Sequence, residues 1–266
     1  QAFVILGELS QDEAALVKSF LLRTKIPFYA ESLSQLSGDP DLATYSLSSS
    51  EILVKKAFQQ KLFDSVLRIG GIPTLRFWRD LEAEFSQIPV INFSDRPFSG
   101  LSRTSQLFSL SSLSEIHFEN EDRAGWVDFK SKIHELQKKK LALLEKYPLS
   151  EPSCVQSFSN QVGEAPLYLG NSLPIRHWDA FSVNQSKSLY GNRGANGIDG
   201  QISTYLGWSE AFKNSFCFVG DLTALYDLAA LGLTPQLADH QRHVVVLNNF
   251  GGQIFQRVLK NKLFIN

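Results

Sequence analysis

Short apolar segments that end in glycine or in polar residues recur along this chain, and helical patterns separate them. Phe3-Val4-Ile5-Leu6-Gly7 precedes apolar residues at helical spacing in residues 11–23, and residues 26–30 form a second apolar segment. A buried strand, a helix and another strand within about 30 residues are typical of a βαβ unit. Because a βαβ unit joins parallel strands through a helix, the pattern predicts an α/β fold with doubly wound, mostly parallel sheets.

The alternation continues through two regions, which we interpret as two domains, residues 1–149 and 150–266. The first region continues with predicted helices at 51–62, 75–86 and 124–146 and predicted strands at 65–71 and 88–93. The second has predicted strands at 165–170, 216–220 and 244–247 and predicted helices at 152–162, 200–213 and 222–231. Residues 147–152 carry two prolines and form the best linker candidate between the two domains.

Composition narrows the class of protein. The 266 residues are 43% hydrophobic and 20% charged, as expected of a soluble globular protein with a core. The formal net charge of −1 gives no bulk electrostatic reason to bind nucleic acid or an anionic membrane, and no apolar run is long enough for membrane insertion. Cys154 and Cys217 lack metal-ligand spacing, which favours a reducing cytoplasm.

A glycine-rich stretch, residues 192–204, is too polar for a core strand and leads into a predicted helix. It contains Gly194, Gly197 and Gly200. A glycine-rich loop before a helix can hold an anion or a cofactor, because its backbone N–H groups point outward and the helix dipole favours negative charge. Glycine and asparagine clusters also form ordinary turns, so this stretch leaves both readings open.

Polar residues follow three predicted strands of the second domain. The carboxyl ends of parallel strands lie at one edge of a sheet, where such sheets bind ligands. We therefore expect one cluster there, made of Asn171, Ser172, Asp221, Asn248 and Asn249. A carboxylate, side-chain amides and loop carbonyls are hard oxygen ligands, which suit Mg²⁺ bound to a phosphate better than zinc.

The spacing of these residues resembles that of a known enzyme family. Gly220-Asp221 and Asn248-Asn249, with residues 222–247 between them, resemble the diphosphate- and metal-binding motif of thiamine-diphosphate enzymes, except that Leu222 replaces the usual third glycine. Together with residues 171–176 and 192–200, this departure resembles the carboligases of menaquinone biosynthesis within that family. The motifs lie in residues 170–255, whereas residues 1–149 are similar to the family's middle domain in pattern only.

The resemblance implies a cofactor site with a bound metal. It assigns Mg²⁺ (or Mn²⁺) to the Asp221 carboxylate, the Asn249 amide oxygen and the Gly251 carbonyl. It assigns thiamine diphosphate to a site lined by Ile198, Gly220, Leu222, Thr223 and Asn248, in which Ile198 holds the cofactor bent. Without the resemblance, Asp221 could be a plain helix cap and Ile198 a core residue.

The resemblance also implies the substrates, 2-oxoglutarate and isochorismate, which both carry carboxylates. Arginine binds carboxylates through two parallel hydrogen bonds, and the implied catalytic residues are Arg176, Arg193 and Ser172. The implied substrate pocket adds Ile254, Phe255 and, on a looser match in the first domain, Arg76. Structural salt bridges and ordinary packing are the alternatives for these residues.

The implied activity is a decarboxylating carboligation by a cytoplasmic homodimer or homotetramer without membrane insertion. In this family the glutamate that activates the cofactor lies in an N-terminal pyrimidine-binding domain. We expect this chain to comprise the middle domain and most of the diphosphate-binding domain, and therefore to be inactive by itself. Two alternatives stay open: another thiamine-diphosphate decarboxylase or carboligase, similar to acetohydroxyacid synthase, and a non-catalytic fragment that only binds the cofactor.

Overall fold

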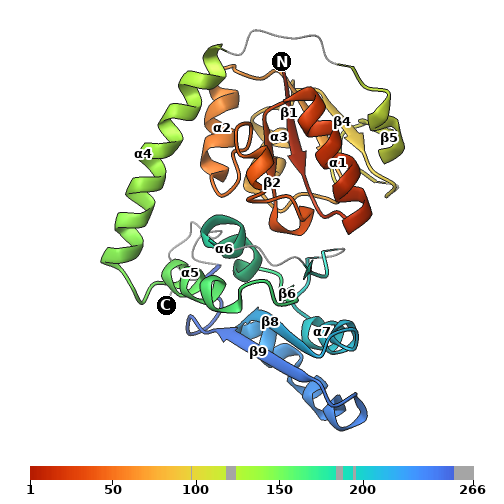
Figure 1. Ribbon diagram of the computed structural model, residues 1–266, viewed down its shortest axis with the longest axis vertical. Coiled ribbons are helices and arrows are strands. Elements are labelled where there is room, and N and C mark those ends of the chain that lie inside the picture. The colour runs from red at the N-terminus through yellow and green to blue at the C-terminus, as the bar shows by residue number, and fades with distance from the viewer. Residues whose placement is uncertain (97, 118–123, 184–187, 194–195, 255–266) are drawn as a thin grey trace. The chain divides into compact units, whose positions relative to one another are not determined.

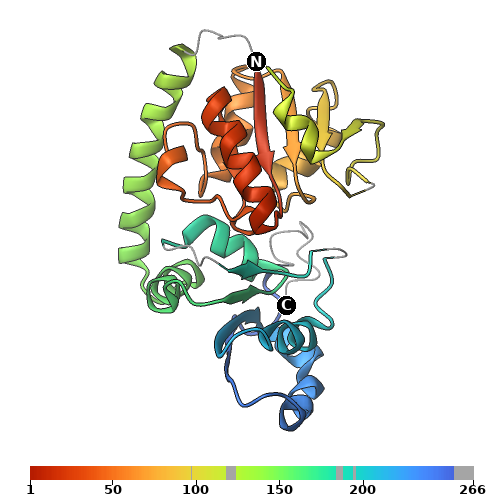
Figure 2. The same ribbon diagram turned by 45° about the vertical axis from the view of Figure 1, so that its right-hand side comes forward.

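The computed structural model describes residues 1–96, 98–117, 124–183, 188–193 and 196–254, and it divides into two compact units, Gln1–Ser153 and Cys154–Asn266. Each unit contains a parallel sheet with helices packed against it, as Figure 1 and Figure 2 show. The predicted fold class, α/β with doubly wound parallel sheets, is confirmed. The assignment of the units to a middle domain and a diphosphate-binding domain stays a prediction.

The first unit is built on five parallel strands in the order β2-β1-β3-β4-β5. Their bounds are β1 Ala2–Leu6, β2 Phe28–Ala30, β3 Ser65–Ile69, β4 Val90–Phe93 and β5 Gln106–Phe108. The chain goes from β1 to β2 on one side and then continues to β3 on the other, so the strand order reverses between β1 and β3. In doubly wound sheets this reversal opens a crevice at the carboxyl ends of the strands.

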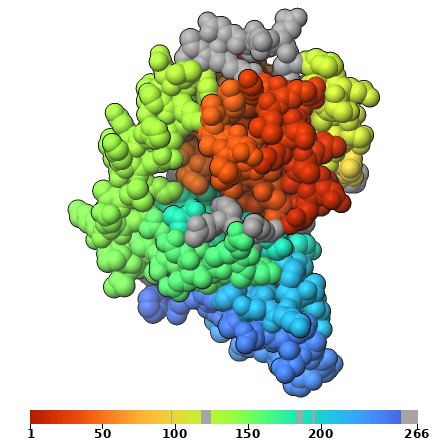
Figure 3. All heavy atoms as spheres, in the orientation of Figure 1, coloured from red at the N-terminus to blue at the C-terminus, as the bar shows by residue number. Residues whose placement is uncertain are grey.

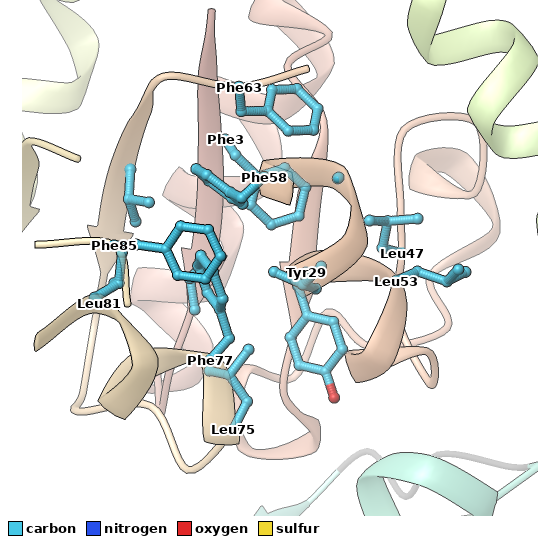
Figure 4. Close-up of a cluster of buried hydrophobic side chains, with 14 of the residues drawn as sticks. Phe3, Tyr29, Leu47, Leu53, Phe58, Phe63, Leu75, Phe77, Leu81 and Phe85 are labelled. Carbon is cyan, nitrogen blue, oxygen red and sulfur yellow. The ribbon is translucent and has the colours of Figure 1, made fainter. Parts of the chain in front are cut away.

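Side chains of the first sheet alternate between two cores. Phe3 and Ile5 belong to a cluster with helices α2 (Glu51–Gln59) and α3 (Arg76–Ala83), whose aromatic rings Figure 4 shows. Val4 and Leu6 belong to a second cluster with α1 (Gln11–Thr24). Helices therefore cover both faces, as the period of two along a strand requires.

Helix α4 (Ala124–Lys146) closes the first of these cores. Its apolar residues Trp126, Phe129 and Ile133 are buried in the same cluster as α2 and α3. Figure 3 shows the yellow-green atoms of this long helix beside the orange atoms of the first unit. In the part of the chain that the structure describes, no helix is both long enough and apolar enough to cross a membrane.

Helix α1 shows why the sequence starts a helix where it does. The Ser10 hydroxyl accepts a hydrogen bond from Glu13 N at 3.3 Å, and Glu13 Oε2 accepts one from Ser10 N at 2.6 Å. This capping box satisfies two backbone N–H groups that have no partner inside the helix. The helix predicted at residues 11–23 therefore begins at its predicted residue.

The second unit has four parallel strands in the order β7-β6-β8-β9. Their bounds are β6 Leu167–Leu169, β7 Leu189–Tyr190, β8 Asn214–Gly220 and β9 Gln241–Leu247. The helices are α5 Glu151–Val162, α6 Leu173–Phe181, α7 Gln201–Ser209 and α8 Asp221–Tyr226. Cys217 and Val219 of β8 pack with α7, whereas the ring of Phe218 lies 5.2 Å from Phe158 of α5 and 6.0 Å from Trp178 of α6.

Some predicted bounds were wrong. Residues 222–231 are not one helix, because α8 ends at Tyr226 and a 3₁₀ helix, Leu228–Gln236, follows. The Asp227 carboxylate between them accepts hydrogen bonds from Ser203 N and Oγ, at 2.6 and 2.8 Å, and its backbone leaves the helical region. Helix α6 was not predicted, although Pro174 near its start is a typical start signal. Elsewhere in the described residues, short 3₁₀ helices span Ser32–Ser34, Pro40–Leu42 and Leu110–Ser114.

Candidate functional site

The candidate site lies at the carboxyl ends of β6, β8 and β9. Leu169 pairs with Phe218, and Gly220 pairs with Leu247, so the three strands end at one edge of the sheet. The strand order reverses between β6 and β8, which is the usual ligand position in a doubly wound sheet. The predicted cluster follows directly from these strand ends and comprises Asn171, Ser172, Asp221, Asn248 and Asn249.

Asn171 holds the glycine-rich loop against the end of β6. Its side chain is buried, and its Nδ2 donates to Asn192 O at 2.8 Å and to Gly197 O at 2.7 Å. Its Oδ1 accepts a hydrogen bond from Arg193, which is itself 9% exposed. One side chain therefore fixes both ends of the described loop and orients Arg193.

Gln201, which sequence reasoning missed, supports the same loop from the first position of α7. Its Oε1 accepts hydrogen bonds from Tyr168 Oη at 3.1 Å and Asn171 N at 3.4 Å, and its Nε2 donates to Gly197 O at 3.1 Å. Burial raises the pKa of the Tyr168 phenol, which keeps its proton available for this bond. A glutamine at the start of a predicted helix gives no sequence signal of such a role.

Arg176 and Ser172 are linked through the backbone. Arg176, the fourth residue of α6, donates a hydrogen bond to Ser172 O at 2.7 Å. Ser172 has φ 75° and ψ −128°, a region that side-chain-bearing residues rarely occupy. Such strain at the end of a strand persists only where surrounding contacts enforce it, and it is frequent at functional sites. The two residues predicted to bind substrate therefore form one local unit.

Asp221 connects the ends of β8 and β9. Its Oδ1 accepts a hydrogen bond from Leu222 N at 2.7 Å, although the N-cap residue of α8 is Gly220 and not Asp221. Its Oδ2 accepts one from Gly251 N at 2.8 Å, a contact that helix capping does not explain. Phe250 and Gly251 both have left-handed backbones, with φ 65° and 106°, and this turn brings the loop after β9 back to Asp221.

The donor set at this position suits a hard cation. Each carboxylate oxygen of Asp221 accepts one hydrogen bond and keeps a lone pair that could bind a cation. The Gly251 carbonyl and the Asn249 amide, which are further oxygen ligands, belong to the loop that Asp221 contacts. Among the described residues no group of three or more His, Cys, Asp or Glu side chains could hold a metal. The predicted ligand set contains a single carboxylate and does not depend on such a group.

The remaining predicted site residues lie in the second unit, except Arg76. Gly220, Leu222 and Ile198 are half-buried in the second unit, and Thr223 is buried. The Asn248 side chain accepts a hydrogen bond from Phe250 N at 2.9 Å. Ile254 is half-buried at the end of the described chain, and Phe255 lies outside the described residues. Arg76 belongs to the first unit, where its mostly exposed side chain lies 3.4 Å from Asp80.

The chain is similar in sequence to several known synthases that share one name. No protein-family model matches the chain. A 2-succinyl-5-enolpyruvyl-6-hydroxy-3-cyclohexene-1-carboxylate synthase of Bdellovibrio bacteriovorus is 43% identical over 99% of the chain and 50% of its own length. Synthases of the same name from Akkermansia muciniphila and Trichodesmium erythraeum are 36% and 31% identical, over 95% and 86% of the chain and 47% and 42% of their own lengths.

The chain thus spans about half the length of the curated relatives that it matches. The similarity extends through both units, including the first, for which the motifs gave only a loose match. By sequence the chain belongs to the family of 2-succinyl-5-enolpyruvyl-6-hydroxy-3-cyclohexene-1-carboxylate synthases.

Proposed function

We propose that the protein is a thiamine-diphosphate- and Mg²⁺-dependent decarboxylating carboligase that joins 2-oxoglutarate, as a succinic semialdehyde equivalent, to isochorismate in menaquinone biosynthesis. The hydrogen bond between Asp221 and Gly251 carries this proposal, because it brings together the two halves of the diphosphate- and metal-binding motif. The relatives, which are synthases of this pathway by name, support the proposal.

The residues at the strand ends fit the cofactor and its metal. Asp221, Asn249 and the Gly251 carbonyl would hold Mg²⁺ or Mn²⁺, which would neutralise the diphosphate. Gly220, Leu222, Thr223 and Asn248 would line the diphosphate, and Ile198 would support the cofactor's rings. When bound, thiamine diphosphate supplies a carbon nucleophile for a keto carbon and takes up the electron pair left when CO₂ departs.

The remaining residues of the site would bind and orient substrate carboxylates. Arg193 is held by Asn171, and its planar guanidinium would bind a substrate carboxylate through two parallel hydrogen bonds. Arg176 uses one N–H on Ser172 O and could present others to a second carboxylate. Ser172 would add a hydroxyl hydrogen bond beside Arg176, and Ile254, Phe255 and Arg76 would complete the pocket.

Two alternatives make different demands on the site. A carboligase similar to acetohydroxyacid synthase would use the same cofactor residues but would not need both Arg176 and Arg193. A non-catalytic fragment would bind the cofactor and turn over no substrate. We expect the active protein to be a cytoplasmic homodimer or homotetramer, and this chain alone to be inactive because the activating glutamate belongs to the pyrimidine-binding domain.

Calorimetric titration of the chain with thiamine diphosphate, with and without Mg²⁺, tests the cofactor site. We expect Mg²⁺-dependent binding that is lost in Asp221→Asn and retained in Asp239→Asn, which changes an exposed aspartate of the same unit. Equal binding by both variants would contradict the metal assignment. For the full-length gene product, we expect CO₂ release from 2-oxoglutarate and not from pyruvate; the reverse preference would favour the acetohydroxyacid-type alternative.

A further inference from the structure

Arg68 is a buried charge in the first unit, whereas the residues proposed to bind the cofactor belong to the second unit. It lies on β3, in register with Ile5 and Asn92 of the neighbouring strands. Its side chain is 0% exposed, and Nε, Nη1 and Nη2 have no hydrogen-bond partner among the described residues. A buried guanidinium with five unused donors is rare, because buried polar groups almost always find partners.

Arg68 keeps its charge at neutral pH. Burial, together with the smaller effect of the nearby positive charge of Arg96, lowers the pKa of its guanidinium to about 10. Since this pKa is well above 7, the group cannot avoid the cost of burial by losing its proton. A buried charge without a counterion is strongly unfavourable, so the fold calls for a negative group at this position.

No carboxylate among the described residues makes a hydrogen bond with the Arg68 guanidinium. The Glu8 carboxylate, after β1, binds Arg96 at 2.6 Å. Asn92, beside Arg68 in the sheet, is neutral, and its amide donates to Ser105 Oγ and Gln106 O, both at 2.9 Å. Arg68 and Arg96 are therefore two neighbouring positive side chains, and the Glu8 carboxylate pairs with Arg96.

The surroundings of Arg68 resemble those of a ligand site. The strand order of the first sheet reverses between β1 and β3, and Arg68 is the penultimate residue of β3, close to the carboxyl end of that strand. Arg96 follows β4 and is 42% exposed, so solvent reaches this edge of the sheet. The buried Trp78 Nε1, in the core cluster on the same face, is another donor without a partner among the described residues.

We propose that Arg68 is the centre of an anion-binding site in the first unit, which takes a small ligand through a carboxylate or phosphate group. The planar guanidinium matches two oxygens of either group, Arg96 adds a long-range attraction, and Trp78 offers a further N–H donor. The ligand supplies the missing negative charge and stabilises the fold when it binds. The residues of this site belong to the first unit, and the proposal does not depend on the proposed function.

Thermal unfolding of the protein in increasing sodium phosphate or sodium acetate, at fixed ionic strength, tests this site. We expect a saturable rise of about 5 °C in melting temperature for the wild type. The anion that saturates at the lower concentration identifies the preferred group. Arg68→Met should melt no lower than the wild type without anion, since it removes an unpaired charge, and should not respond to either anion.

Two further variants keep the test decisive. Arg79→Met removes an exposed arginine of the same unit and should respond as the wild type does. Arg68→Lys keeps the charge but loses the planar fork, and it should bind at least tenfold more weakly; this variant decides the question if Arg68→Met does not fold. A wild type without a saturable response, or an unchanged affinity in either Arg68 variant, would overturn the proposal. Mg²⁺-dependent binding of thiamine diphosphate should be unchanged in Arg68→Met, which separates this test from that of the cofactor site.

Discussion

Replacing Asn171 by alanine should release the loop that carries Arg193. The change removes the amide that donates to Asn192 O at 2.8 Å and to Gly197 O at 2.7 Å, and it removes the acceptor that orients Arg193. Of the two carbonyls, Gly197 O keeps a hydrogen bond from Gln201 Nε2. Asn192 O loses the hydrogen bond from Asn171.

The magnitude follows from these bonds. Loss of the neutral hydrogen bond to Asn192 O costs about 1 kcal/mol, and loss of the bond to the charged Arg193 side chain costs about 2 kcal/mol. Loss of the bond to Gly197 O costs least, because this carbonyl keeps another partner. We therefore expect the free energy of opening the loop to fall by about 3 kcal/mol, which corresponds to a roughly 100-fold larger open population.

Limited trypsin digestion measures this population directly, because trypsin cleaves after Arg193. When opening and closing are fast, the cleavage rate follows the population of the open loop. Cleavage after Arg193, followed by mass spectrometry, should be about 100-fold faster in Asn171→Ala than in wild type. Asn214→Ala, which changes an exposed asparagine of the same unit, should leave the rate unchanged. An increase below about fivefold in Asn171→Ala would show that Asn171 does not hold the loop.

Three further predictions concern the same unit. Gly170→Ala should destabilise the protein by about 1–3 kcal/mol in chemical denaturation, because the added Cβ would lie 2.7 Å from Cγ1 of Val219; unchanged stability would contradict this close packing. Cys154 is exposed and should react readily with a maleimide at pH 8, whereas Cys217 is buried and burial raises its thiol pKa, so labelling of Cys217 in the native protein would be the contrary result. Ser172→Gly should raise the free energy of unfolding by up to about 1 kcal/mol by relieving the left-handed backbone at φ 75°, and a loss of stability would argue against strain there.

The sequence was most informative where a local pattern has a single structural solution. Apolar segments closed by Gly7, Gly170 or Gly220 indicate buried strands, and their alternation with helices predicts parallel sheets, as observed. Parallel strands end at one edge, so the grouping of Asp221 with the loop after Asn249 could be anticipated from spacing. The roles of these residues stay predictions.

Local pattern was less informative about bounds that long-range contacts decide. The helix predicted at 222–231 ends early because the carboxylate of Asp227 binds Ser203, a residue of α7. The start of α6 was missed for a different reason, because it follows Ser172, whose backbone at φ 75° no sequence pattern indicates. The contact between Asp227 and Ser203 is not visible in the sequence around the break.

The sequence by itself determined the fold class and the edge of the sheet at which polar residues gather, because both follow from the order of strands and helices along the chain. It also determined the family, because the motif residues are read directly from the sequence. Only the tertiary structure decided which polar side chains meet. Asn171 reaches Arg193, and Gln201 reaches Tyr168, because strands and loops distant in the chain pack together. The tertiary structure likewise buries Arg68 without a counterion, since whether a charge finds a partner depends on every element packed around it.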